Sequence, residues 1–370
     1  MFYSRLFAGI SFLGFALVTM GTIRLALAER GWPMVAGDAR NLDDQRAVVH
    51  LNPRDSAAWM AIGLGAERDG DLEEASHSLL EAEKVDRQYL PAWTSANFFF
   101  RRADDHQFWR AAARAAAMSY DDPAPLIELA DRREPNAGTA LDRLGDSAHL
   151  ERGYIRFLMG QRRWQEAGAV AARLSLRGEA RDRELMFNLT DRLIEANEAD
   201  AALAAWNGIQ HFPALDRARH GRLVNQDFKG QPSGEGFDWR VTEAPRGSVR
   251  WEPSKLQFWL AGSTPEACKL VEQWVVLDAG CYCLRFKYRT EGLAAETGLR
   301  WTLLHRGREE ASSAVLGLAP GRGPDPKVTE WSFRVAEAGL YQLAWVYRRV
   351  PGTTHQEGLA ELAHVDLEAR

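Results

Sequence analysis

Few side chains in this 370-residue sequence have the type and spacing that catalysis needs. The sequence contains no Walker-type phosphate loop, no nucleophile elbow and no HExxH zinc motif. The glycines within residues 317–326 link two strand-like runs and no helix follows them, whereas a phosphate cradle needs a helix N-terminus. We therefore expect a protein that is not an enzyme, with no catalytic residues and no organic cofactor.

Tryptophan side chains in the C-terminal part are candidates for sugar binding, because flat aromatic rings can stack on sugar faces. The candidates are Trp259, Trp274 and Trp301. Trp259 and Trp274 are out of phase with the aliphatic residues of their runs, so period-two alternation predicts that these two are exposed. The alternative is that most of the rings lie in the core, since aromatic side chains bury large areas.

The composition is that of an ordinary globular protein, with 46% hydrophobic and 26% charged residues. The length is sufficient for two domains. The formal net charge is −5 and no block of Lys and Arg stands out, so we expect no nucleic-acid partner.

The three cysteines, Cys268, Cys281 and Cys283, all lie in the last third of the chain. Their spacing matches no zinc site, because no further paired Cys or His accompanies them. In an oxidising compartment Cys268 could form a disulfide with either of the other two. The equally open alternative is three small thiols on buried strands.

The N-terminus contains an 18-residue run without charge, residues 6–23, which is just long enough to cross a bilayer as a helix. We expect an uncleaved anchor here, with signal-peptide cleavage near Ala28 and a buried helix as alternatives. The anchor would place the protein at the inner membrane, facing the periplasm or the cell exterior. Cleavage would make it a secreted protein.

The rest of the chain falls into two parts with different periodicity. Residues 38–220 are rich in Ala, Leu, Glu and Arg and have a helical pattern, whereas residues 221–370 contain short aromatic runs that alternate with period two. We expect an α + β multidomain protein with residues 1–30 as signal anchor or signal peptide. A helical superhelix over 38–220 is followed by a β-sandwich over 221–370.

The helical part contains a 34-residue repeat. Trp59 and Trp93 are 34 residues apart, and Ala167 and Ala201 repeat this interval later. Residues 56–89 resemble a tetratricopeptide (TPR) unit, a pair of antiparallel helices. The matching positions are Trp59, Ile62, Gly63, Ala75, Leu79 and Ala82. The alternative is an unrelated helical bundle.

The TPR resemblance implies a partner-binding groove lined by the first helix of each pair. Carried onto the units that start at residues 56 and 90, the family geometry places six residues in it: Ala57, Met60, Leu64, Thr94, Asn97 and Phe98. This surface is mostly small or apolar, so it would suit an apolar or helical protein segment better than an acidic tail.

The C-terminal part resembles jelly-roll domains related to carbohydrate-binding modules. The stretch "LVNQDFKGQPSGEGFDWRV" at 223–241 is similar to their first strand and "LAELAHVDLEAR" at 359–370 to their last. The resemblance implies a polysaccharide as a candidate ligand and a structural calcium at Asn225, Asp227 and Asp366. Lys229 stands where the pattern has an acid, which opposes a cation there.

The sequence as a whole predicts a membrane-anchored cell-envelope adaptor that binds protein partners through its repeats. Its layout resembles bacterial envelope proteins of exopolysaccharide export or surface-polymer assembly. The alternative is a carbohydrate-binding protein that uses the jelly roll. A polymer-modifying enzyme is a second alternative that no motif supports.

Overall fold

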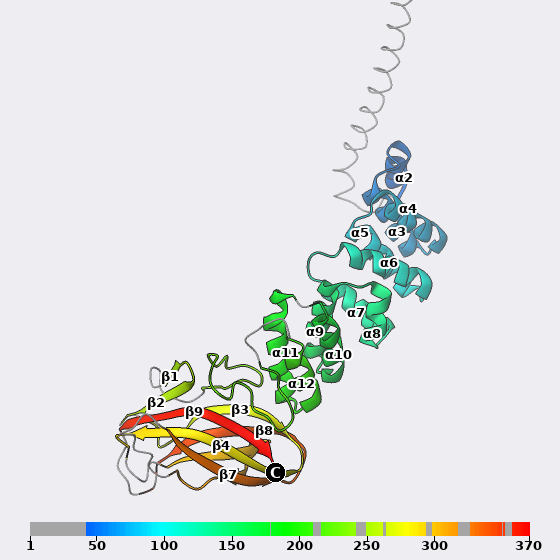
Figure 1. The fold of residues 1–370 in the computed structure, drawn as a ribbon. Coiled ribbons are helices and arrows are strands. Elements are labelled where there is room, and N and C mark those ends of the chain that lie inside the picture. Colours follow the sequence, from blue (N-terminus) through cyan, green and yellow to red (C-terminus); the bar gives the residue numbers. More distant parts are fainter. Residues whose placement is uncertain are drawn as a thin grey trace, which may run out of the picture. The chain divides into compact units, whose positions relative to one another are not determined.

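The computed structural model describes residues 42–177, 179–209, 216–241, 249–261, 264–293, 298–316, 326–349, 351 and 357–370 (Figure 1). The expected anchor at residues 6–23 and the expected cleavage position near Ala28 lie outside these residues. Across the described part, no helix is long and apolar enough to cross a membrane.

Eleven α-helices occupy the described residues up to Asn207. They are α2 (Leu42–Leu51), α3 (Ser56–Asp69), α4 (Leu72–Val85), α5 (Tyr89–Arg101), α6 (Asp105–Met118), α7 (Ala124–Arg133), α8 (Ala137–Leu144), α9 (Ala148–Gly160), α10 (Trp164–Ser175), α11 (Arg183–Glu195) and α12 (Ala199–Asn207). The chain forms two compact units, Met1–Gly153 and Tyr154–Arg370, so the division falls inside α9. The change from helices to strands lies within the second unit.

Short turns with capping side chains make α3 and α4 an antiparallel pair. The Asp55 side chain accepts from the Ala58 amide at the start of α3, and Gly70 ends that helix in the left-handed conformation with φ of 88°. Asp71 then caps α4 by accepting from the Glu74 amide. Because a carboxylate satisfies a free amide at each helix start, the chain reverses within two residues.

Small residues let the paired helices approach closely, as the repeat predicts. Ala75, Leu79 and Ala82 are fully buried on α4. A Cβ on Gly63 would lie 2.6 Å from Cγ of Leu79, so only glycine fits at that point of α3. In the later repeat the contact is less tight, because a Cβ on Gly168 of α10 would lie 3.4 Å from Cβ of Ala201 on α12, at the edge of ordinary van der Waals contact.

Overpacking tests this helix contact. We expect Ala75→Trp to lower the free energy of unfolding by about 1–3 kcal/mol, because the buried site on α4 has no room for an indole. Ala117→Trp on the exposed face of α6 is the matched control and should change stability little. Denaturant unfolding followed by circular dichroism measures both, and equal effects would contradict the assigned packing.

The C-terminal part is a sandwich of two antiparallel sheets. Its strands are β1 (Val249–Glu252), β2 (Lys255–Leu260), β3 (Ala267–Leu277), β4 (Gly280–Glu291), β5 (Leu299–His305), β6 (Arg308–Ser312), β7 (Lys327–Val335), β8 (Gly339–Arg348) and β9 (Gly358–Ala369). The five-stranded sheet has the order β1-β2-β9-β4-β7 and the four-stranded sheet has the order β3-β8-β5-β6.

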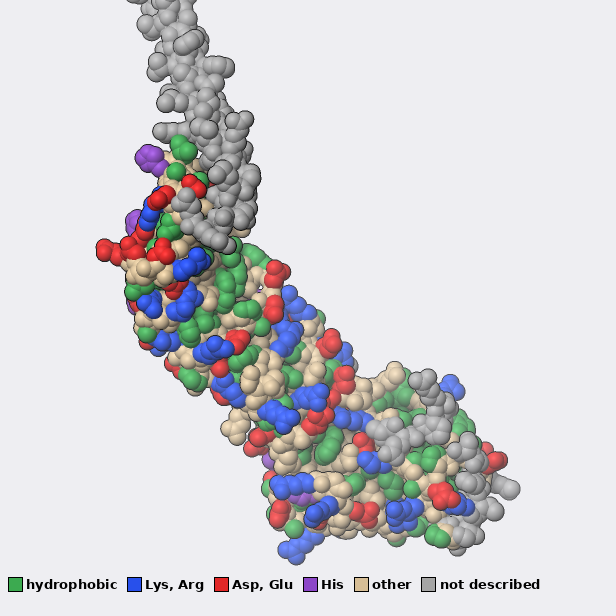
Figure 2. Space-filling view, turned by 180° about the vertical axis from the view of Figure 1, so that it is seen from behind, with side chains coloured by type: hydrophobic (Ala, Val, Ile, Leu, Met, Phe, Trp, Pro, Cys, Tyr) green, Lys and Arg blue, Asp and Glu red, His purple; other side chains and the backbone are tan. Residues whose placement is uncertain are grey.

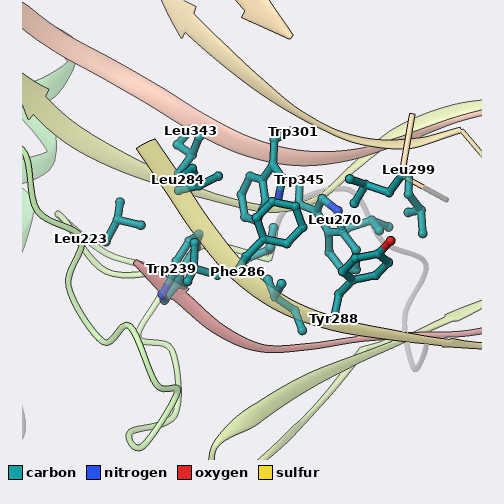
Figure 3. Close-up of a cluster of buried hydrophobic side chains, with 14 of the residues drawn as sticks. Leu223, Trp239, Leu270, Leu284, Phe286, Tyr288, Leu299, Trp301, Leu343 and Trp345 are labelled. Atoms are coloured by element: carbon teal, nitrogen blue, oxygen red, sulfur yellow. The ribbon is translucent and has the colours of Figure 1, made fainter. Parts of the chain in front are cut away.

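Aromatic side chains fill the space between the two sheets (Figure 3). Trp301 is fully buried, and its ring centroid lies 5.7 Å from that of Phe286, 6.2 Å from that of Trp345 and 6.3 Å from that of Trp239. Trp301 is therefore part of the core, and the hypothesis that it stacks on a sugar is wrong.

All three cysteines are free thiols, so of the two alternatives that the sequence left open the disulfide is not formed. Cys268 lies at the start of β3, whereas Cys281 and Cys283 follow the turn at the far end of that strand. Leu277 lies nine positions after Cys268 on β3. At 3.3 Å per residue, the two residues are about 30 Å apart along the extended strand. A disulfide needs its Cα atoms within about 7 Å, so the two ends of β3 cannot be bridged. Cys268 and Cys283 are buried and Cys281 is exposed.

Helices α11 and α12 pack against the segment that precedes β1, inside the second unit. The Trp206 and Phe237 rings, both buried, meet edge to face with centroids 6.2 Å apart. Asp191 of α11 accepts from the Gly236 amide at 2.7 Å and forms an ion pair with Arg240. The Trp206 indole also donates to the Asp216 carbonyl at 3.0 Å. The last helix pair and the sandwich therefore share a continuous contact.

Gly236 gives the sharpest test of this contact. Its φ is +54°, and a Cβ there would lie 2.4 Å from the Trp206 ring. We expect Gly236→Ala to destabilise the second unit by about 1–3 kcal/mol more than Gly234→Ala, by overpacking. Gly234 also has positive φ, +77°, but nothing lies within 4 Å of its Cβ position. Thermal unfolding of both variants measures the difference, and equal losses would show that backbone strain alone is responsible.

Candidate functional site

The candidate site is the exposed face of the first helices, α3 and α5, of two successive helix pairs. Residues 34 apart in sequence meet across these helices. The Thr94 hydroxyl lies 3.7 Å from the Met60 sulfur, and the Arg101 guanidinium binds both carboxylate oxygens of Glu67 at 2.9 and 2.6 Å. The contacts match the register that the repeat predicts, so equivalent positions of the two units lie side by side.

We call the surface formed by Ala57, Met60, Leu64, Leu90, Thr94 and Asn97 the first-helix face. Leu64 is 42% exposed and Leu90 is 56% exposed, while the other four are partly buried. Five of these six were predicted from the TPR geometry. Leu90 was missed, although its place four residues before Thr94 on a helix puts it on the same face.

The polar side chains of the first-helix face donate to carbonyl groups of their own helix. Thr94 donates to the Leu90 carbonyl at 2.9 Å, and Asn97 donates to the Trp93 carbonyl at 2.9 Å. These bonds use the Thr94 hydroxyl hydrogen and one of the two Asn97 amide hydrogens. The Glu67–Arg101 ion pair lies beyond Leu64 and Asn97 along the two helices.

Phe98 does not belong to this face, in contrast to the sequence prediction. It is 2% exposed, and its ring packs edge to face on Phe99 with centroids 5.1 Å apart. Leu64, 34 residues earlier, is exposed at the equivalent position. The helical period alone does not tell these two positions apart, because burial depends on which further helix covers each turn.

Charges of both signs accompany the apolar residues of the helical part. Figure 2 shows acidic and basic side chains interspersed over the face in view. Buried Glu83 is the clearest structural case, since it accepts from Arg110 at 3.1 Å and from Arg114 at 2.9 Å. This network ties α4 to α6 and uses its charges internally, so it supports the scaffold rather than a ligand.

The two tryptophans proposed for sugar binding lie on different sheets. Trp259 is on β2 of the five-stranded sheet, is 39% exposed and alternates with buried Phe258 and Leu260. Trp274 is on β3 of the four-stranded sheet, is partly buried and pairs with Gln342 of β8. Both point away from the core, as period two predicts, but on opposite outer faces of the sandwich. They therefore do not form a single site.

The three residues suggested for calcium each have other partners. Asn225 donates to the Gly230 carbonyl at 2.9 Å, and Asp366 accepts from Gln226 at 3.0 Å. Asp227 contacts His364 at 2.6 Å and Lys229 at 3.3 Å. In the described residues, no group of three or more His, Cys, Asp or Glu is arranged to hold a metal ion. Calcium here stays a prediction, and the ion would have to displace these contacts.

The comparisons with known proteins give a likeness of fold for parts of the chain. No family model matches, and no curated protein matches. A solved structure titled "CBM4 structure and function" is 11% identical, with a TM-score of 0.31 over 40% of this chain and 98% of that one. PilF of Pseudomonas aeruginosa is 14% identical, with a TM-score of 0.25 over 53% of this chain and 90% of that one.

A third solved structure is the secreted serine protease VesC from Vibrio cholerae. It is 14% identical, with a TM-score of 0.22 over 35% of this chain. The match spans 24% of the length of that protease. At these identities the likeness concerns fold alone.

The Asp227–His364 contact predicts a pH dependence. The hydrogen bond from His364, helped by Lys229, lowers the pKa of Asp227. An aspartate whose pKa is lowered on folding stabilises the protein at pH values above its ordinary pKa of about 3.9. This stabilisation is lost as the pH falls through the pKa of the folded state. We expect Asp227→Asn to cost at most about 0.5 kcal/mol at pH 6, since the pair is half exposed, and to cost less near pH 3. Unfolding curves at both pH values measure it. A cost that does not change with pH would contradict the assignment.

Proposed function

We propose that this chain is a non-enzymatic adaptor that binds a protein partner through the first-helix face. The observation that carries the proposal is the Thr94–Met60 contact, which joins two repeat units into one surface beside exposed Leu64 and Leu90. Exposed leucines on adjacent helices are an apolar surface, and such surfaces are characteristic of interaction sites.

The residues of this face favour binding of a partner helix through the apolar side of that helix. Helix recognition uses apolar anchors at helical spacing, and Leu90 and Thr94 are one helical turn apart on α5. The Glu67–Arg101 pair offers charge beyond the apolar residues, where interfaces are usually polar and solvent-accessible. The pair would contribute to the register of the partner rather than to most of the affinity.

We further propose that residues 6–23 hold the adaptor at the inner membrane, with the rest of the chain in the periplasm or at the cell exterior. The support is the length and lack of charge of this run. The proposed process is exopolysaccharide export or surface-polymer assembly, by resemblance of layout. Carbonate extraction of membranes tests the anchor, and recovery of a soluble chain that begins at Glu29 would replace it with a secreted protein.

Two charges in the first-helix face should abolish partner capture. We expect Met60→Glu with Thr94→Glu to eliminate crosslinked partner in pull-downs from membranes, because two carboxylates would have to be buried in an apolar contact. Both positions are only partly buried, so circular dichroism and thermal unfolding should stay close to those of the unsubstituted protein.

Two control pairs make this experiment specific. Tyr120→Glu with Leu176→Glu adds the same charge at sites 85% and 87% exposed that are not part of the first-helix face, and should leave capture intact. Trp259→Ala with Trp274→Ala should also leave it intact. Capture lost only with the tryptophan pair, together with lost retention on a polysaccharide column, would place the function in the sandwich.

A further inference from the structure

The segment that leads from α12 into the sandwich forms an open concavity of about 730 Å³ in the second unit. Its lining is almost entirely polar: Asp216, Arg217, Arg219, Arg222, Leu223, Asn225, Gln226, Asp227, Lys229 and Gly230. Four of these side chains are basic and two are acidic. A cationic hollow is unexpected on a chain whose formal net charge is −5.

Two arginines of this lining are held opposite each other by a tight turn. Arg219 and Arg222 form an isolated antiparallel bridge, with the Arg222 amide donating to the Arg219 carbonyl at 3.2 Å. Gly221 between them has a φ of +67°, and its amide donates to the Val276 carbonyl of β3 at 2.8 Å. Directly opposed residues point to the same side, and like charges so placed are destabilising. The turn therefore places two cationic side chains on the same side of the chain.

The acids of the lining are bonded to groups other than these arginines. Asp216 accepts from the Asn225 amide at 3.0 Å, and Asp227 is engaged by His364 and Lys229. Within the described residues, the side chains of Arg219 and Arg222 have no hydrogen-bond or ion-pair partner. Both are exposed, so their guanidinium groups are available to a ligand.

We propose that this concavity binds an anionic glycan through the Arg219–Arg222 pair. Guanidinium groups bind carboxylates in a bidentate manner, and their planar fork gives the contact a defined geometry. A volume of about 730 Å³ is within the range of small-ligand sites, roughly 300–1,000 Å³, and suits a short oligosaccharide. Leu223 is the one apolar side chain among the described residues that line it, so binding there would depend on charge and hydrogen bonds rather than on aromatic stacking.

The site differs from the first-helix face and from both exposed tryptophans, so it stands independently of the proposed function. Its position overlaps that suggested for calcium, at Asn225 and Asp227. The two ligands are opposite in charge, and the free arginines beside those residues favour the anion.

The test is calorimetric titration of the full chain in detergent with oligogalacturonate, a carboxylate-bearing glycan, at low salt. We expect saturable binding that weakens at least about tenfold in Arg219→Ser with Arg222→Ser, since each tenfold corresponds to about 1.4 kcal/mol. Arg306→Ser with Arg308→Ser is the matched control. These arginines also flank a glycine in a tight turn, between β5 and β6, and should leave affinity within about twofold because β6 and β3 are opposite edges of the sheet.

Further titrations separate the alternatives. Methyl-esterified oligogalacturonate, which lacks the charge, should not bind. The proposal is overturned if oligogalacturonate does not bind, or if both arginine pairs weaken it equally. It is also overturned if polyphosphate or single-stranded DNA binds through Arg219 and Arg222 while the glycan does not. Calcium that stabilises the protein and loses this effect in Asp227→Asn would show a cation site instead.

Discussion

The close approach of α3 to α4 at Gly63 is the constraint on which the helical part depends. Leu79 occupies the space where any side chain at residue 63 would lie, and Ala75 and Ala82 keep the rest of α4 equally close. This contact buries one side of each helix and leaves the other side free. Because α5 follows at the same interval, Thr94 is brought to Met60 and Arg101 to Glu67. The first-helix face is thus a consequence of packing on the opposite side of the same helices.

A second tight contact joins α11 and α12 to the segment that leads into the sandwich. Trp206 fills the space above Gly236, and Asp191 binds both the Gly236 amide and Arg240. The Arg240 backbone continues into the sheet by pairing with Glu272 of β3. A chain of short contacts therefore runs from α11 and α12 to the edge strand of the four-stranded sheet. The same segment carries the Arg219–Arg222 turn, so the cationic concavity lies where this segment is held by β3.

The sequence patterns predicted the features of the fold that depend on residues close together in the chain. The 34-residue repeat gave the helix pairs and the register of Met60 with Thr94, since small residues at a fixed interval require stacked helices. Alternation with period two correctly predicted that Trp259 and Trp274 point away from the core. It could not predict that they lie on different sheets, because strand order is set by pairing between distant segments such as β2 with β9 and β3 with β8. Cys268 is a similar case, since the length and direction of β3 exclude a bridge that spacing alone allows.

Burial and charge also depend on neighbours that the sequence does not identify. Phe98 and Leu64 occupy equivalent repeat positions, yet one is 2% exposed and the other 42%. The jelly-roll resemblance implies a cation site at Asn225, Asp227 and Asp366, where Lys229 opposes it. The turn at Gly221 instead brings Arg219 and Arg222 together beside an aspartate that Lys229 and His364 already engage. Arg219 and Arg222 are only three positions apart in the sequence, but their opposition across a turn is visible only in the structure.

The central claim is that the first-helix face contacts a protein partner, and site-specific photocrosslinking in cells tests it most directly. A benzophenone amino acid would replace Leu64 or Leu90 on the face, and Tyr120 or Leu176, which are also exposed but are not part of it. We expect the same discrete crosslinked product from both face positions and none from the other two. Crosslinks of equal yield from all four positions, or a product only from a probe at Trp259, would contradict it.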